Sequence, residues 1–569
     1  MLARAGGAMT ETDRYWLKHY PPGMPADIDA SRFDSIAALM EEGFQRHAGR
    51  DAFVFMDRFL RFDELDRLST AFGAWLQSTG LPPGARVAIM LPNVPQYPVA
   101  LAGALRAGYV VTNVNPLYTP RELEHQLKDS GAEAIVVLEN FASNLAQVIG
   151  RTQVRHVVTT GIGDLLGFPR GAMVNFAVRR VKKMVPRYSL PDSMRFGEAL
   201  VAGGRRGIER VPRGPDDIAL LQYTGGTTGV SKGAMLLNRN LVANVLQMEA
   251  CVEAGLEARR AATGHAQLSM ACPLPLYHAA ALVGCALFGI RAGVMNVLIA
   301  NPRDVPAMAR ELGKHRVNWM TGVNTLFNAL ADDPGFRRQD FSSMYWASGG
   351  ATAVQQAVAE KWQALTGVSI RQAYGLTEAS PLLTATPIDA QGFSGDVGLP
   401  VPGTEIAIVD ENGRHLPPGE PGELLARGPQ VMGGYWQRPE ETAKAITPDG
   451  WLRTGDIAVM DDRGYVRIVD RKKDMIIVSG FNVYPNEIED VVAMHPGVRE
   501  CAAIGVSDER SGEAVKLYVV RADPRLTKES VADHCRQQLT GYKRPKIIEF
   551  RDQLPKSPVG KILRRELRD

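Results

Sequence analysis

Residues 218–233 read Ile218-Ala-Leu-Leu-Gln-Tyr-Thr-Gly-Gly-Thr-Thr-Gly-Val-Ser-Lys-Gly233, an apolar strand that leads directly into a loop of glycines, hydroxyl side chains and one lysine. Glycines let the backbone turn tightly and bring its N–H groups toward an anion, while the hydroxyls and the lysine add donors and charge. The order Ser231-Lys232-Gly233 departs from a Walker A loop, in which glycine precedes the lysine. We therefore interpret the loop as a site for the β- and γ-phosphates of a nucleotide and disfavour a P-loop phosphotransferase.

Outward from this loop, short apolar runs alternate with segments of helical pattern up to about Gly403. Arg86–Leu91, Ala134–Leu138 and His156–Thr159 are typical of buried strands, and Pro120–Ser130 is typical of a helix. This alternation predicts an α/β fold with largely parallel sheet. Turn-rich, alternating sequence then predicts a β-rich subdomain over about 403–470, after which mixed α and β patterns return.

The composition is that of a globular protein. Of 569 residues, 45% are hydrophobic and 22% charged, and Lys+Arg 65 against Asp+Glu 62 gives a net charge of +3. This balance argues against nucleic-acid binding by the chain as a whole. The 5 cysteines are scattered without a CxxC pair, which disfavours a disulfide framework or a zinc site and fits a reducing cytosol.

Two segments bear on membrane targeting. The start of the chain has no apolar region typical of a signal peptide, and Met1 and Met9 are both candidate starts. Ala279–Ala300 is apolar but is interrupted by Arg291 and by glycines. We expect this stretch to form a buried helix and a following strand, each too short to span a bilayer.

A set of motifs, taken together with the loop, resembles the adenylate-forming superfamily of acyl-CoA synthetases, luciferases and adenylation domains. The matching segments follow in order: Pro275–His278, Ser348–Ala351, Tyr374–Glu378, Trp451–Asp456, Asp470–Glu489 and Pro555–Ile562. The resemblance runs from about residue 30 to the end of the chain. Val114–His125, Thr321–Leu330 and Gly541–Arg568 are similar to bacterial long-chain fatty-acid–CoA ligases in particular.

The resemblance implies an α/β N-terminal domain over 1–470 and a small mobile α+β C-terminal domain over 471–569. It implies a ligase that uses ATP, Mg²⁺ and CoA to convert a long-chain fatty acid first to acyl-AMP and then to acyl-CoA. A ligase for medium-chain or aryl acids, or for a carrier-protein thiol, stays open as an alternative. A non-catalytic binding protein is disfavoured because Lys561, Glu378 and Asp456 are all present.

The resemblance also implies a role for each matching residue. Lys561, His278, Thr224 and Glu378 are the expected catalytic residues, and Glu378 and Thr224 the expected Mg²⁺ ligands. His278, Val323 and Gly350 are expected at the acyl site, Lys473 at the hinge, and Ser479 and Gly480 at the CoA channel. The expected ATP and AMP contacts are Thr224, Gly225, Gly226, Thr227, Thr228, Gly229, Lys232, Gly349, Gly350, Ala351, Tyr374, Gly375, Thr377, Asp456 and Arg471.

The acyl site is further expected to draw on Thr321–Phe327 and Trp346–Gly350, since an apolar chain gains up to ~0.8 kcal/mol for each buried methylene. Trp346 is bulkier than the residue typical at that place, so it is a candidate to shorten or redirect the site.

The strongest departure in composition is Phe168–Leu190, which holds six cations and no acid. On a helix, Val174, Val178, Val181 and Val185 would form one stripe, with cations opposite. Such a helix either docks on anionic lipid or packs on its own domain. We expect a cytoplasmic protein, on the first interpretation also peripheral on the inner face of the cell membrane. The superfamily resemblance further allows a homodimer.

Overall fold

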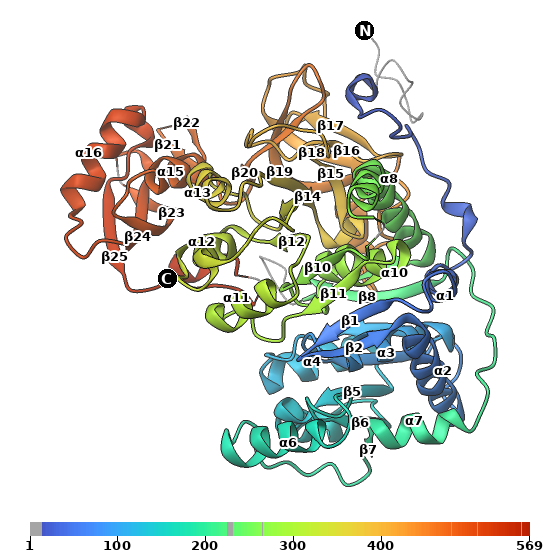
Figure 1. Ribbon diagram of the computed structural model, residues 1–569. Helices are drawn as coiled ribbons and strands as arrows, with labels where there is room; N and C mark the ends of the chain where they lie inside the picture. The colour runs from blue at the N-terminus through green and yellow to red at the C-terminus, as the bar shows by residue number, and fades with distance from the viewer. Residues whose placement is uncertain are drawn as a thin grey trace.

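The computed structural model describes residues 14–224, 231–264, 266–479, 481–508, 510–558 and 560–568. Two large sheets form the N-terminal part, a small antiparallel sheet follows, and a fourth sheet belongs to the C-terminal part (Figure 1). Helices cover the large sheets, which confirms the predicted α/β class.

A seven-stranded sheet carries the phosphate-loop strand. Its order is β7-β6-β5-β3-β4-β8-β9, parallel throughout except for the β8–β9 pair. The strands are β3 (Arg86–Met90), β4 (Val110–Asn113), β5 (Ala134–Leu138), β6 (His156–Thr160), β7 (Met194–Arg195), β8 (Ile218–Thr224) and β9 (Lys232–Leu237). The associated helices are α2 (Phe62–Ser78), α3 (Gln96–Arg106), α4 (Pro120–Ser130), α5 (Ala142–Val148), α6 (Arg170–Phe176) and α7 (Phe196–Gly204).

A nine-stranded sheet has the order β16-β15-β14-β13-β12-β10-β11-β1-β2, parallel from β14 through β1. Its strands are β1 (Asp51–Phe55), β2 (Arg58–Arg61), β10 (Ser269–Cys272), β11 (Met295–Leu298), β12 (Trp319–Gly322), β13 (Trp346–Gly349), β14 (Ile370–Gly375), β15 (Leu382–Ala385) and β16 (Leu399–Pro400). The helices are α1 (Ile36–Arg46), α8 (Asn238–Ala262), α9 (Ala279–Ala281), the π-helix η6 (Leu282–Leu287), α10 (Phe288–Ala292), α11 (Val305–Lys314), α12 (Asn324–Asp332) and α13 (Gln356–Thr366).

The two remaining sheets are smaller. One is antiparallel, with β17 (Glu405–Val409), β18 (Gly422–Arg427), β19 (Leu452–Met460) and β20 (Val466–Arg471), and is accompanied by α14 (Pro439–Ala445). The C-terminal sheet holds β21 (Ile476–Val478), β22 (Phe481–Val483), β23 (Val498–Asp508), β24 (Gly512–Arg521) and β25 (Ile547–Arg551), with α15 (Pro485–Ala493) and α16 (Lys528–Gln538).

The local sequence explains several of these bounds. Helix α4 begins at Pro120 because Thr119 caps it reciprocally with Glu122, and it ends where Gly131 turns at φ +61°. Strand β5 is buried along its whole length, as expected of a parallel strand covered on both faces.

The apolar stretch 279–300 folds as expected, into the buried segment α9-η6-α10 and then β11. Arg291 lies in this segment with only 3% of its side chain exposed, and it pairs with Glu42 of α1 at 2.6 Å and Glu249 of α8 at 3.0 Å. Among the described residues, every helix is too short or too polar to cross a bilayer.

The basic segment differs from the expected valine-striped helix. The α-helix α6 is short and passes into a π-helix, η5 (Ala177–Val181), so that Val185 lies beyond it. Val174 packs against the core, whereas the exposed apolar side chains are those of Phe168, Met173, Phe176, Val181 and Met184. The prediction failed because the helix widens at Ala177 and ends after one further turn, which breaks the regular spacing of the stripe.

Candidate functional site

The ends of the phosphate loop are held by two antiparallel strands. Thr224 ends β8, Lys232 begins β9, and the two residues are paired across the strands. The Ser231 hydroxyl donates to the Thr224 carbonyl at 2.7 Å, which closes the base of the loop. The predicted phosphate contacts Gly225, Gly226, Thr227, Thr228 and Gly229 lie outside the described residues.

Tyr435 connects two of the predicted site residues. Its hydroxyl donates to Glu378 Oε1 at 2.7 Å, and Lys232 Nζ lies 5.3 Å from the centre of its ring. Burial, and then the Glu378 carboxylate, raise the pKa of Tyr435, so its hydroxyl stays a donor. Lys232 also pairs with Glu441 of α14 and lowers the pKa of Glu441 to about 2.

Sequence reasoning missed Tyr435 and Glu441. They lie outside every motif that carried the resemblance, and nothing in their local pattern marks them. Only the packing of α14 and the preceding turn against β9 brings them to Lys232.

Asp456 of the antiparallel sheet contacts two other predicted residues, Arg471 and Tyr374. It lies in β19 opposite Arg471 of β20, and its Oδ1 is 3.1 Å from Arg471 Nε. Its Oδ2 accepts a hydrogen bond from the Tyr374 hydroxyl at 2.6 Å. The Asp456 side chain is buried, so both oxygens are fixed in place. The result is a carboxylate positioned at the ends of β14 and β20.

Lys561 approaches the same place from the C-terminal end of the chain. Burial, with a contribution from Arg471, lowers the pKa of Lys561 to about 8, while Asp456 opposes the shift. The Gly560 carbonyl accepts a hydrogen bond from Thr325 Oγ1 of α12 at 3.1 Å. Gly560 has φ +80°, and a Cβ there would lie 2.8 Å from Thr325 Oγ1 and 3.2 Å from Val323 Cγ2.

The predicted acyl residues share one edge of the nine-stranded sheet. Strands β10, β12 and β13 are parallel neighbours, and His278, Val323 and Gly350 follow their carboxyl ends. His278 Nε2 is buried without a hydrogen-bond partner among the described residues, and burial lowers the His278 pKa to about 4. His278 is therefore a neutral imidazole at neutral pH.

Close packing explains the small residues of the predicted adenine segments. A Cβ at Gly349 would lie 2.5 Å from Val354, and one at Gly375 would lie 1.8 Å from the Pro381 carbonyl. Ala351 adopts φ +62° just after β13. Thr377 begins the short helix η8 (Thr377–Ala379), which presents Glu378 toward Tyr435.

The comparisons with known proteins agree with this geometry. Residues 40–436 match the model of the AMP-binding enzyme family, and residues 487–561 match that of the AMP-binding enzyme C-terminal domain. The chain belongs to the AMP-binding enzyme family. Its membership confirms the resemblance that the motifs predicted.

Several relatives of this AMP-binding enzyme match along nearly its whole length. It is 54% identical to a long-chain-fatty-acid–CoA ligase of Escherichia coli O157:H7 over 98% of both chains, and 34% identical to one of Bacillus subtilis over 98% of both. A feruloyl-CoA synthase of Amycolatopsis is 35% identical, over 90% of this chain and 93% of that protein.

Solved structures show the same fold. ATP-bound MatB from Rhodopseudomonas palustris superposes with a TM-score of 0.80 at 28% identity, over 94% of this chain and 98% of MatB. An anthranilate CoA ligase bound to anthranoyl-AMP superposes with a TM-score of 0.83 at 23% identity, over 95% of this chain and 98% of that chain.

The residues predicted for the hinge and the CoA channel of the AMP-binding enzyme lie around strand β21, after Arg471. Lys473 is in the exposed turn that follows β20 and precedes β21. Ser479 follows β21 with φ +51°, and its N–H donates to Ser511 of the same C-terminal sheet region at 2.8 Å. Gly480 lies outside the described residues.

Arg564, a third residue that the motifs did not predict, anchors the C-terminal tail of the enzyme. Its guanidinium lies 3.1 Å from Asp470 and 2.8 Å from Glu489, and donates to the Asn486 side chain at 2.5 Å. These carboxylates overcome the effect of burial and raise the pKa of Arg564. The tail that bears Lys561 is thereby tied to strand β20 and to α15.

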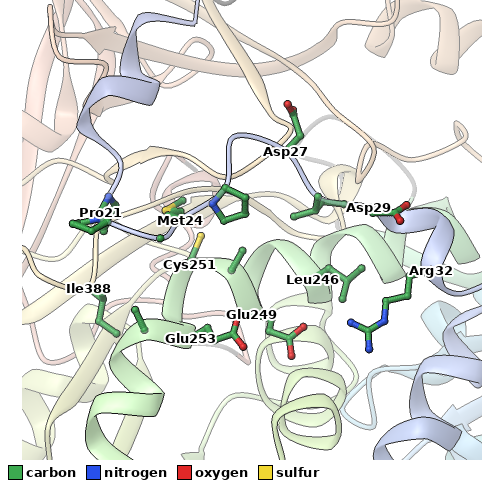
Figure 2. A pocket seen from close by; sticks show the side chains of 16 residues that line it. Pro21, Met24, Asp27, Asp29, Arg32, Leu246, Glu249, Cys251, Glu253 and Ile388 are labelled. Carbon is green, nitrogen blue, oxygen red and sulfur yellow. The ribbon is translucent and has the colours of Figure 1, made fainter.

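The enzyme also has a cavity of about 490 Å³ between its N-terminal segment and helix α8. Figure 2 shows Met24, Asp27 and Asp29 on one side, and Leu246 and Glu249 of α8 on the other. Its lining includes none of the residues predicted for the nucleotide, acyl or CoA sites.

Proposed function

We propose that this AMP-binding enzyme is an ATP-dependent long-chain fatty-acid–CoA ligase. A carboxylate attacks the α-phosphate of ATP to give acyl-AMP and pyrophosphate, and the CoA thiol then displaces AMP to give acyl-CoA. The observation that carries the proposal is the half-buried Lys561 side chain, whose pKa responds to both Asp456 and Arg471, at a site shared with Tyr374. Full-length similarity to curated long-chain ligases supports the substrate class.

Each charged group has a task in the first half-reaction. Negative charge builds on the phosphoryl oxygens in the transition state, so preplaced cations stabilise it. Lys561 bridges the substrate carboxylate and the α-phosphate. Lys232 leaves its ion pair with Glu441 and binds the β- and γ-phosphates instead. Asp456 accepts hydrogen bonds from the ribose hydroxyls, and neutral His278 orients the acid without adding charge.

Glu378 and the Thr224 hydroxyl fit Mg²⁺, since both offer the hard oxygen donors that this ion prefers. Glu378 is half-exposed, and the Tyr435 hydroxyl bonds to its Oε1, which fixes the orientation of the carboxylate. When bound, Mg²⁺ would neutralise charge on the phosphates. Tyr435 would then act as a positioning residue for the ligand oxygen.

For the second half-reaction we infer a rotation of the C-terminal domain about Lys473. Lys561 leaves the site, and Ser479 and Gly480 come to line the path of the CoA thiol. The hydrogen bond between Thr325 of α12 and the Gly560 carbonyl is a contact that this rotation would break.

The test is mass spectrometry of products from purified protein, ATP, Mg²⁺ and a panel of acids, with and without CoA. We expect acyl-CoA from long-chain acids and acyl-AMP when CoA is withheld. Acyl-AMP that never passes to CoA would point to a carrier-protein thiol instead. No adenylate from any acid would overturn the enzymatic proposal.

We also propose that the segment 168–190 contacts the inner face of the membrane weakly and reversibly. Phe168 is 93% exposed and Val181 69% exposed, beside Arg180, Lys182 and Lys183, which have no carboxylate within salt-bridge distance among the described residues. Apolar side chains among unpaired cations fit an anionic lipid surface. Arg179 is excluded from this role because it pairs with the buried Glu139.

The expected homodimer rests on the family resemblance alone. Sedimentation equilibrium of the purified chain tests it, and a monomer at all concentrations would overturn it.

A further inference from the structure

One wall of the proposed acyl site continues along β12 and β13 toward the amino ends of these strands. Side chains alternate between the faces of a strand, so Trp346 and Ser348 share a face with Gly350, and Trp319 and Thr321 share a face with Val323. Trp319 and Trp346 lie with ring centres 5.0 Å apart, and Trp319 Nε1 donates to Ser348 Oγ at 2.9 Å. Four residues of strand set Trp346 about 13 Å behind Gly350.

The helical segment that starts beside His278 faces this wall. Phe288 of α10 contacts the Trp319 ring at 5.5 Å between centres. Thr321 and Ser348 are only half-buried, although β12 and β13 are central strands of the nine-stranded sheet. An acyl chain that begins at His278 and Gly350 would follow the exposed parts of Thr321 and Ser348 toward the two tryptophans.

Two buried polar atoms in this wall lack partners among the described residues. One is Trp346 Nε1, on a residue that is only 5% exposed. The other is Nε of Arg371, whose guanidinium lies 5.2 Å from the centre of the Trp346 ring. A terminal nitrogen of Arg371 donates to the Ala390 carbonyl at 3.3 Å, and Asp389 is the nearby acidic residue.

Both unpartnered atoms are N–H donors, so an acceptor on the ligand would satisfy them. A purely hydrocarbon chain would leave them unpaired, which disfavours its binding relative to a chain that carries an oxygen. Burial lowers the pKa of Arg371, as expected of a cation whose surroundings are mainly apolar.

We propose that Trp346 and Arg371 form a subsite for an acceptor oxygen on the acyl chain, distant from the reacting carboxylate. The inference rests on the proposed ligase function and narrows its substrate class to oxygenated fatty acids. A hydroxyl, an oxo group or a second carboxylate supplies the same acceptor chemistry. Trp346 and Arg371 are specificity residues in this proposal and take no part in the bond changes.

The experiment measures kcat/KM for adenylation, by pyrophosphate release, with acids of equal chain length. The panel is an unsubstituted fatty acid, its hydroxy and oxo derivatives, and the corresponding dicarboxylic acid. We expect the wild-type enzyme to prefer at least one oxygenated acid over the unsubstituted acid by about ten-fold or more. The derivative that is preferred identifies which acceptor the subsite takes.

Two variants test the assignment of the donors. W346F keeps an aromatic ring but removes the N–H, and R371M keeps the length of the side chain but removes the donors. In each variant we expect the kcat/KM for the oxygenated acid, divided by that for the unsubstituted acid, to fall toward one. The matched control is W362F, which removes an equally unpartnered indole N–H from α13, where Trp362 packs on Phe327 and Phe336. The control should leave the ratio unchanged.

The outcomes separate this inference from the ligase function. Turnover of the unsubstituted acid with a kcat/KM equal to or above that of every derivative would overturn the subsite and leave the ligase intact. The subsite would also be overturned if W346F and R371M both leave the ratio of kcat/KM values unchanged. Thermal melting curves would have to show that both variants are folded. If W346F does not fold, R371M alone decides. No adenylation of any acid would overturn both proposals.

Discussion

At the scale of single residues, the chemistry depends on how the fold sets the charge of a few side chains. Lys561 is the clearest example, because its pKa is lowered from 10.5 to about 8 by burial and by the cation of Arg471. Its role as a bridge between two anions requires the protonated form. The ammonium is therefore available below pH 8 and is lost as the pH rises through that value.

We predict that the adenylation rate falls as the pH increases through about 8, well below the usual range of lysine. Replacing Lys561 by alanine should lower adenylation by roughly 10²–10³-fold, the usual effect of losing one preplaced charge donor. Pyrophosphate release measured over about two pH units on either side of this value, with thermal melting to check that the protein stays folded, tests both.

The control is K561R, whose guanidinium stays charged over that range. Whatever activity K561R retains should lack the alkaline decline near pH 8. The same decline in K561R would assign it to another group.

In the proposed site, Tyr374 acts on the nucleotide through Asp456. Y374F removes the hydroxyl that donates to Asp456 Oδ2 at 2.6 Å. We predict a KM for ATP raised by roughly five- to ten-fold, since one net hydrogen bond is worth about 1 kcal/mol, with little change in kcat. Initial rates at varied ATP check this, and a fall in kcat alone would place Tyr374 in the chemical step.

In the proposed site, Glu441 competes with ATP for Lys232, with which it forms an ion pair. In E441Q the lysine no longer has a carboxylate partner, so we predict a lower KM for ATP. Both side chains are about a third exposed (28% and 32%), which limits the gain to about five-fold or less. Added salt should reduce the difference in the KM for ATP between E441Q and the wild-type enzyme. A higher KM for ATP in E441Q would contradict the competition.

The residues that could be predicted are those whose neighbours in sequence identify them. Asp456 follows a Thr-Gly turn and Glu378 stands within Tyr374–Glu378, and the structure sets both beside tyrosines at the site. Tyr435, Glu441 and Arg564 could not be predicted, because each acts across a tertiary contact to a residue distant in sequence.

At the scale of elements, the parallel strands were predictable because burial on both faces leaves continuous apolar runs, as in β5. The helix α4 was predictable from its cap and its terminal glycine. The basic segment was not, because the change from α- to π-helix at Ala177 depends on packing that residue spacing does not reveal. In the proposed mechanism, the loop that carries Gly560 and Lys561 selects which half-reaction proceeds.

We predict that G560A slows adenylation by about ten-fold, because φ +80° costs an alanine roughly 1–2 kcal/mol and its Cβ would meet Thr325 Oγ1. Thioester formation from added acyl-AMP should be unchanged, because the loop is undocked in that step. Rates of the two half-reactions, measured separately, check the prediction. Equal slowing of both would mean that the substitution acts on the fold rather than on docking.

At the scale of the whole molecule, the basic segment lies at a rim of the N-terminal part, away from the C-terminal domain (Figure 1). Phe176 and Arg180 also line an open hollow of about 700 Å³ beside α6. Membrane contact there would leave the C-terminal domain able to rotate.

We predict that the protein co-sediments with vesicles containing anionic lipid and that added salt weakens the binding. Charge reversal in R180E/K182E/K183E should abolish it, since each cation contributes about 1 kcal/mol at such a surface. The matched control is R310E/R337E/R338E, three exposed arginines on α11 and the turn after α12. Equal loss in both triple variants would indicate a response to net charge rather than a docking segment.

The buried Arg291 has a consequence that begins before the protein is folded. A chain emerging from the ribosome presents residues 279–300 as one apolar stretch, which membrane-insertion machinery could accept as a span. An arginine near the middle of such a stretch adds about 2.5–3.5 kcal/mol to the cost of insertion. In the finished protein Glu42 and Glu249 neutralise that same charge. On this argument one residue would act twice, first by disfavouring insertion of the growing chain and later by joining α1, α8 and α10.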